Sequence, residues 1–155
     1  MAGAGAALAI FLLLTLENKF QLPLLMAPFG ASCVLLFLLP QSPLSQVKNV
    51  IGGHALSTSV GLLFVFLITT LFAEETPLEI NIVTALAVGF SIILMGLFKV
   101  VHPPAGADPI VVLLAHQSSF FIFFPVVAGA VLLVLVAFFQ QKLIQKLFNN
   151  SHSKH

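Results

Sequence analysis

The sequence predicts an all-α integral membrane protein built from six hydrophobic segments. Of its 155 residues, 59% are hydrophobic and only 7% are charged, and the mean hydropathy is +1.14. Soluble domains carry about a quarter charged residues, so this composition excludes an ordinary soluble protein. Residues 51–72, 80–98 and 118–139 contain no Asp, Glu, Lys or Arg. Each of these stretches is long enough to cross a bilayer core of about 30 Å.

Three further apolar runs complete the predicted fold. Residues 1–16 form a fourth long segment, and we expect a membrane helix there rather than a cleaved signal because no basic residue precedes it. Residues 29–39 and 105–115 are too short to cross as simple helices, and each begins at Pro and Gly. We therefore expect one transmembrane domain over residues 1–148 and a polar tail over residues 149–155.

An internal repeat is predicted by two similar short segments. The sequence PFGAS at residues 28–32 aligns with PAGAD at residues 104–108. We call the displacement in residue number between these two segments the repeat offset. The same offset aligns Gly53 with Gly129. The units would be residues 1–73 and 78–148, although such Ala/Gly-rich matches also arise by chance. Because each unit has three segments, an odd number, the second unit would be inverted relative to the first. Small residues predict close helix contacts at Gly53, Ser57 and Gly61, and again at Ala85 and Gly89.

Charges between the segments predict the topology. If both short segments cross, the lysines at positions 48, 99, 142, 146 and 154 share one side, and Glu74, Glu75 and Glu79 lie on the other. The positive-inside rule then places both termini in the cytoplasm. If both short segments are re-entrant, this bias is lost.

Composition and motifs exclude several classes of function. The net charge is only +1, which does not favour nucleic-acid binding. The single cysteine, Cys33, cannot form a disulfide within the chain. We find no nucleotide loop, nucleophile elbow or closely spaced metal-ligand pair, so we expect no enzyme, no catalytic residues, no cofactor and no metal. The expected partners are lipid, a small solute and further copies of the chain.

The most informative motif is HPPAGADP at residues 102–109, which lies between two uncharged apolar stretches. Ionisable groups inside a membrane are costly and usually mark a transport pathway. The free amides at a helix start bind small anions, and donors outnumber carboxylates in the apolar part of the chain. We therefore predict a small-anion site made of helix-start amides and Ser, Asn and His side chains: Gly30, Ala31, Ser32, Asn49, His54, His102, Gly106 and Ala107.

Other residues in these motifs have a predicted role in proton coupling or in structure. His102 and Asp108 are the candidates for proton coupling, and Pro28, Pro103 and Pro104 are expected to start the short helices. The alternatives are that Asp108 only stabilises a helix start and that His54 is a packing histidine. Three further groups have plain structural interpretations: Lys48 and Lys99 as topology anchors, and His116 as a helix C-cap.

Three motifs in order resemble the HPP family of small integral membrane proteins: PFGAS at residues 28–32, NVIGGH at residues 49–54 and HPP at residues 102–104. The resemblance covers roughly residues 21–140. It implies transport, because members in cyanobacteria and chloroplasts are associated with nitrite transport. It also implies a bacterial or cyanobacterial plasma (inner) membrane, or a chloroplast envelope. The family is usually described with four transmembrane helices, fewer than the six segments counted here.

The sequence therefore predicts a multi-pass transporter or channel for a small monovalent anion, most simply nitrite. Two alternatives remain at this stage. One is a passive channel for a small neutral solute, which needs little positive charge in its pore. The other is a non-transporting membrane scaffold, which a sealed core would favour.

Overall fold

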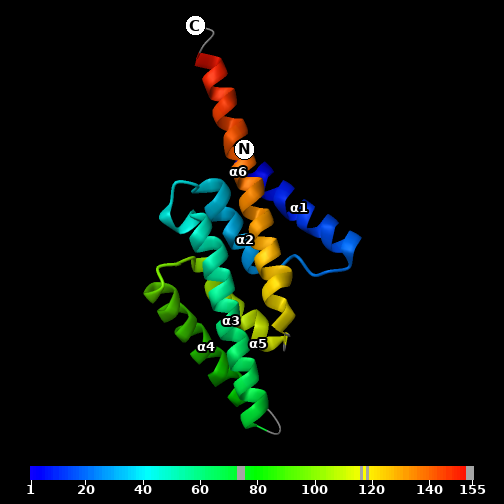
Figure 1. Ribbon diagram of the computed structural model, residues 1–155, viewed down its shortest axis with the longest axis vertical. Coiled ribbons are helices and arrows are strands. Elements are labelled where there is room, and N and C mark those ends of the chain that lie inside the picture. The colour runs from blue at the N-terminus through cyan, green and yellow to red at the C-terminus, as the bar shows by residue number, and fades with distance from the viewer. Residues whose placement is uncertain (73–75, 116, 118, 153–155) are drawn as a thin grey trace.

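The computed structural model describes residues 1–72, 76–115, 117 and 119–152, and this part of the chain is helical without strands. Figure 1 shows the six α-helices in space. They are α1 (Ala2–Phe20), α2 (Pro28–Cys33), α3 (Val47–Leu71), α4 (Pro77–Leu97), α5 (Asp108–Leu114) and α6 (Ala128–His152). Helix α2 continues into the short π-helix η1 (Val34–Leu38), and the short 3-10 helix η3 (Pro103–Ala107) leads into α5. The predicted all-α membrane fold is confirmed.

Four of these helices are long and apolar enough to cross a membrane: Ala2–Phe20, Val47–Leu71, Pro77–Leu97 and Phe124–Leu147. The two shorter apolar helices are Pro28–Leu38 and Pro103–Leu114. At 1.5 Å per residue each short helix is only about 17 Å long, roughly half the bilayer core. Each begins at proline because a first helical residue needs no amide hydrogen and proline already has a helical φ.

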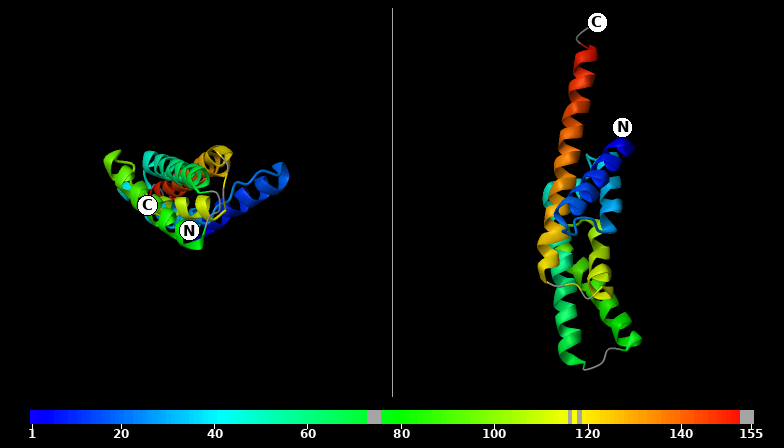
Figure 2. Two further views of the ribbon diagram at one scale, coloured as in Figure 1. Left: turned by 90° about the horizontal axis from the view of Figure 1, so that it is seen from below. Right: turned by 90° about the vertical axis from the view of Figure 1, so that its right-hand side faces the viewer.

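The two longest helices, α3 and α6, run in opposite directions through the molecule (Figure 1). Helices α1 and α2 lie beside α6 at one end, and α4 and α5 lie beside α3 at the other (Figures 1 and 2). The start of α1 and the end of α6 are at the same end of the molecule (Figure 1). The loop charges also predict that both termini lie on one side of the membrane. Which side of the membrane they face stays a prediction.

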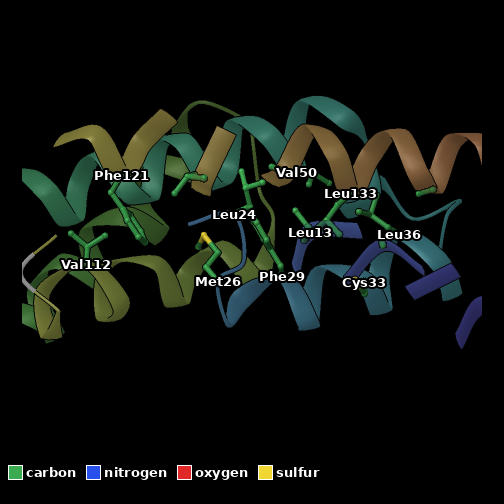
Figure 3. Packing of buried hydrophobic residues seen from close by; sticks show 14 residues of the cluster. Leu13, Leu24, Met26, Phe29, Cys33, Leu36, Val50, Val112, Phe121 and Leu133 are labelled. Atoms are coloured by element: carbon green, nitrogen blue, oxygen red, sulfur yellow. The ribbon is translucent and has the colours of Figure 1, made fainter. Parts of the chain in front are cut away.

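The hydrophobic core divides into two clusters that follow this arrangement. The larger cluster contains Leu13, Phe29 and Leu133, which pack between α1, α2 and α6 (Figure 3). The smaller cluster contains Val60, Ala87 and Leu113, from α3, α4 and α5. The larger cluster joins α1 and α2 of one predicted unit mainly to α6 of the other, and Val50 of α3 and Val112 of α5 also belong to it. The smaller cluster joins α4 and α5 to α3, so the two units interleave.

Corresponding elements of the two units have the predicted spacing. Displaced by the repeat offset, α1 would occupy residues 78–96, and α4 spans Pro77–Leu97. The short helix Pro28–Leu38 would occupy residues 104–114, and its counterpart is Pro103–Leu114. With α3 and α6 antiparallel, these bounds have the form of an inverted repeat.

Two glycines provide equivalent close contacts between the units. A Cβ at Gly53 would lie 3.0 Å from the Val100 carbonyl oxygen, and one at Gly129 would lie 2.6 Å from the Leu24 carbonyl oxygen. In the sequence alignment given by the repeat offset, Leu24 corresponds to Val100. A Cβ at Gly61 would lie 3.0 Å from Cα of Pro109, so this predicted contact is also present. The prediction at Gly89 is wrong, because nothing lies within 4 Å of a Cβ there.

Helix α4 ends in a Schellman motif with an unusual residue. The amide of Val100 donates to the carbonyl of Met95 at 3.0 Å and that of Lys99 donates to Gly96 at 3.2 Å. Lys99 takes the left-handed conformation, with φ 56°. Glycine usually occupies this position because a side chain is strained there.

We expect Lys99→Gly to leave the fold intact and to raise the free energy of unfolding by about 1 kcal/mol, by removing that strain. Lys99 is exposed and outside every contact of the buried polar groups described below. Unfolding of the purified protein by sodium dodecyl sulfate measures the change. Destabilisation by this substitution would show that the lysine ammonium stabilises the fold.

Some predicted features lie outside the described residues. These are Glu74 and Glu75 of the acidic loop, the proposed cap His116, and Lys154 in the tail. The charge pattern that predicts the topology therefore stays a prediction.

Candidate functional site

Four polar side chains meet in the interior where the two short helices approach each other. Ser32 comes from α2, His54 from α3, His102 precedes η3, and Asp108 begins α5. All four are completely buried. We call Ser32, His54, His102 and Asp108 the polar network, and it joins the two predicted units.

The members of the polar network are connected in a line. The Ser32 hydroxyl lies 2.9 Å from Nε2 of His54 and 2.9 Å from Nε2 of His102. On its other side, His54 contacts Oδ2 of Asp108 through Nδ1 at 2.8 Å. The order along the line is therefore Asp108, His54, Ser32, His102.

Two further groups hold the ends of this line. Nδ1 of His102 donates a hydrogen bond to the Leu44 carbonyl at 2.9 Å. The Thr58 hydroxyl donates to Oδ2 of Asp108 at 3.3 Å. Thr58 is also completely buried. Both histidine rings are thus fixed at both nitrogens.

Packing around the polar network keeps water out and orients the rings. Phe29 meets the His54 ring edge to face with centroids 5.1 Å apart, and the two histidine rings are 5.0 Å apart. A Cβ at Gly53 would lie 2.8 Å from Cβ of His102. Only glycine therefore lets the chain before η3 lie this close to α3.

The charge balance of the polar network depends on His54 and Asp108. They form a buried ion pair whenever the imidazole is protonated. The second carboxyl oxygen of Asp108, Oδ1, is buried and has no hydrogen-bond partner among the described residues. An uncompensated buried carboxylate is costly, so this environment favours sharing a proton between the two side chains.

The repeat relates the two polar residues of the short helices. Ser32 and Asp108 occupy the same position of PFGAS and PAGAD, so the repeat offset superimposes one on the other. Both contact the same residue, His54. Equivalent residues of the two units therefore contact the same imidazole.

The structure brings together only part of the predicted anion site. Ser32, His54 and His102 meet, together with the proton-coupling candidate Asp108. The Asn49 amide instead donates to the Pro43 carbonyl at 2.7 Å.

The predicted backbone donors lie apart from these side chains. Gly30 and Ala31 are on the exposed face of α2, and the Gly30 amide donates to Ala27 at 3.1 Å. Gly106 and Ala107 are half-buried in η3. The binding roles of all these residues stay predictions.

Sequence reasoning did not select Thr58 or the Leu44 carbonyl. Thr58 could have been found, since it lies four residues after His54 and therefore on the same helix face. A backbone carbonyl in a turn carries no residue-type signal, so Leu44 could not.

Three members of the polar network have the connectivity of a Ser-His-Asp triad: Ser32 to Nε2 of His54, and Nδ1 of His54 to Asp108. A nucleophilic serine needs an open side for its substrate. Ser32 is completely buried, and its hydroxyl is engaged by both histidines. The described residues contain no group of three or more His, Cys, Asp and Glu side chains that could hold a metal ion.

Comparison with known proteins gives one family and two relatives. The family described as HPP, transmembrane region, matches residues 1–148. A Dictyostelium discoideum protein named a transmembrane protein is 36% identical over 94 residues, which are 61% of this chain and 31% of that protein. A second one is 35% identical over 91 residues, 59% of this chain and 28% of that protein. The chain thus matches less than a third of either relative's length, and no solved structure matches it. The match over residues 1–148 shows that this chain belongs to the HPP family of transmembrane proteins.

Proposed function

We propose that this protein transports a small monovalent anion across the membrane, with nitrite as the best single candidate. The observation that carries the proposal is the complete burial of Ser32, His54, His102 and Asp108 at the meeting point of two short helices. Discontinuous short helices from two inverted units form the substrate sites of many transporters. The nitrite assignment comes from the resemblance to the HPP family.

The two imidazoles converge on one point. Nε2 of His54 and Nε2 of His102 each lie 2.9 Å from the Ser32 hydroxyl oxygen. An anion oxygen that enters between the two rings would accept an N–H from each when both carry a hydrogen on Nε2, and the displaced Ser32 hydroxyl would donate its own hydrogen to the same anion. Such charge-assisted hydrogen bonds compensate for the lost hydration of the anion.

The described conformation is closed, since the polar network has no exposed surface. A shallow apolar groove lies next to it, lined by Ala31, Val34, Leu35, Pro103 and Pro104. Ala31 and Pro103 are the chain neighbours of Ser32 and His102. Separation of α2 from η3 at this groove would open a route to the convergence point.

Uptake into proteoliposomes tests the proposal. Nitrite, nitrate, formate and chloride are compared at two external pH values, for the natural protein and for His102→Gln and Ser32→Ala. We expect saturable nitrite uptake that falls about tenfold or more in both variants, as expected for losing a hydrogen bond to a charged group. Ser59→Ala is the matched control, because Ser59 is exposed on α3 and bonds only its own helix. Unchanged uptake in both network variants would contradict this role.

A membrane scaffold without transport is the second candidate, and the sealed state of the polar network favours it. A scaffold would show no uptake of any of the four anions while the protein remains folded. Uptake that does not saturate and that is unchanged in both network variants would instead indicate the passage of a neutral species such as nitrous acid.

A further inference from the structure

The hydrogen bonds of the polar network determine how many protons it holds. The Leu44 carbonyl can only accept, so Nδ1 of His102 must carry a hydrogen. From this end, each of the other three contacts in the line also needs one hydrogen: His102 to Ser32, Ser32 to His54, and His54 to Asp108. Four contacts in series therefore require at least four hydrogens. The Ser32 hydroxyl oxygen also lies 3.3 Å from the Pro28 carbonyl oxygen, and this longer contact either shares the Ser32 hydrogen or needs one more, so it does not lower the count.

The side chains alone supply one hydrogen too few. Ser32 has one, each neutral histidine has one, and ionised Asp108 has none. Thr58 supplies its own hydrogen to Asp108 and does not alter this count. The complete line of contacts thus exists only when the network has bound an additional proton, and its net charge is then zero.

That proton can take three positions without breaking a contact. On Asp108, the carboxylic acid donates to Nδ1 of His54. On His54, the carboxylate faces an imidazolium. When His54 then passes its Nε2 hydrogen to the Ser32 oxygen, the Ser32 hydrogen moves to Nε2 of His102, which becomes the imidazolium. Each move shifts one proton along a contact of 2.8 or 2.9 Å, and the total charge stays zero.

Loss of this proton has a structural consequence. Three hydrogens would remain for four contacts, so one contact breaks, and the network acquires a net negative charge in an apolar interior. Among the described residues, the side-chain to side-chain hydrogen bonds between the two predicted units are those from Ser32 to His102, from His54 to Asp108 and from Thr58 to Asp108. Three of the four contacts in the line join the two units, and the fourth, from Ser32 to His54, joins α2 to α3. Release of the proton therefore breaks the line at one of these contacts.

The titratable groups that face this line are its own members. Neighbouring elements contribute none: α4 and α6 have their described charged groups away from it. The other titratable side chains whose surroundings the structure describes are Cys33 in the apolar core, Glu79 at the cap of α4, Glu17, which accepts from Leu24 and Leu25, and the exposed Lys19, Lys48, Lys99, Lys142 and Lys146.

We propose that the polar network is a proton-binding site that holds one proton in the closed state, and that release of this proton breaks the line of contacts that joins α2, α3, η3 and α5. The proton is then the coupling ion of the transport cycle, so this inference deepens the proposed function and rests on it for its role in transport. The site itself is tested without any transported anion.

The test is the pH dependence of unfolding of the purified protein in detergent, from about pH 7 upward, where an unfolded chain has neutral histidines and an ionised aspartate. The folded network holds one proton more than the unfolded chain, so raising the pH favours unfolding. The unfolding equilibrium constant of the natural protein should rise about tenfold per pH unit and level off once the native proton is lost.

Asp108→Asn should abolish this dependence. The asparagine amide has its own hydrogen to donate to Nδ1 of His54, so all four contacts form without the additional proton. Ser32→Ala is the second variant, because it divides the line into two contacts for which two neutral histidines suffice. Glu17→Gln is the control: Glu17 accepts hydrogen bonds from Leu24 and Leu25 outside the network and should keep the natural slope.

The outcomes distinguish the two proposals. A natural protein without the slope, or an unchanged slope in both Asp108→Asn and Ser32→Ala, would overturn the proton site. A slope that is lost in these variants supports it, whatever the uptake experiments show. Absence of anion uptake together with the expected slope would reject the anion proposal alone.

Discussion

Substitution of Gly53 by alanine is expected to lower the free energy of unfolding by about 1–3 kcal/mol, the usual range for overpacking a tight contact. The new Cβ would lie 2.8 Å from Cβ of His102 and 3.0 Å from the Val100 carbonyl oxygen. The backbone of residues 100–102 must therefore move away from α3. Because His102 belongs to this segment, the same displacement should weaken its contacts with Ser32 and Leu44.

Gly89→Ala is the matched control within the same fold. Nothing lies within 4 Å of a Cβ at Gly89, which is exposed in α4. Replacing an exposed helical glycine by alanine should stabilise the protein by roughly 0.5–1 kcal/mol. Unfolding curves of both variants against the natural protein measure the two effects. Equal stability of Gly53→Ala and Gly89→Ala would contradict the close contact at Gly53.

Replacement of His54 by leucine is expected to cost about 3–5 kcal/mol, because it leaves Asp108 as a buried acid without its main partner. The polar network would lose its contacts at both ring nitrogens, from Nε2 to Ser32 and from Nδ1 to Asp108. Asp108→Leu should cost less, since a neutral histidine remains and is cheaper to bury than a carboxylate.

The double variant His54→Leu/Asp108→Leu tests whether the two side chains act as a pair. It should be more stable than the sum of the single effects predicts, by about 1 kcal/mol or more, because removing both partners leaves no buried charge. Chemical unfolding of all four proteins at one pH gives this coupling energy. Additive effects would mean that the 2.8 Å contact contributes nothing beyond packing.

The repeat gives the polar network its composition. Ser32 and Asp108 occupy equivalent positions of two inverted short helices, whereas the position equivalent to His54 is Ala130, a buried apolar residue of α6. The two short helices thus have polar residues at equivalent positions. In the third helices of the two units, α3 and α6, only α3 has a polar residue at the position of His54. One imidazole accordingly serves both units, and His102, which lies before η3, completes the line.

The sequence by itself determined the class of the protein, its helices and the residue types of its interior. The absence of charges over long stretches requires helices in a membrane, because only a helix satisfies its own backbone there. The prolines at positions 28, 103 and 104 mark the starts of the short helices, and the repeat offset between PFGAS and PAGAD relates the units. The same reasoning selected His54, His102, Ser32 and Asp108, since polar groups are costly in such a chain.

Only the tertiary structure decided which of these groups meet. Ser32 and His102 are separated by 70 residues and Asp108 and His54 by 54, and local periodicity contains no information on such pairs. Their contacts depend on the interleaving of the two units, which in turn depends on the absence of side chains at Gly53 and Gly129. The sequence predicted several separate donors for an anion. The fold instead joins four of its polar side chains into one closed line, because a buried hydrogen-bonding group must find its partner within the protein.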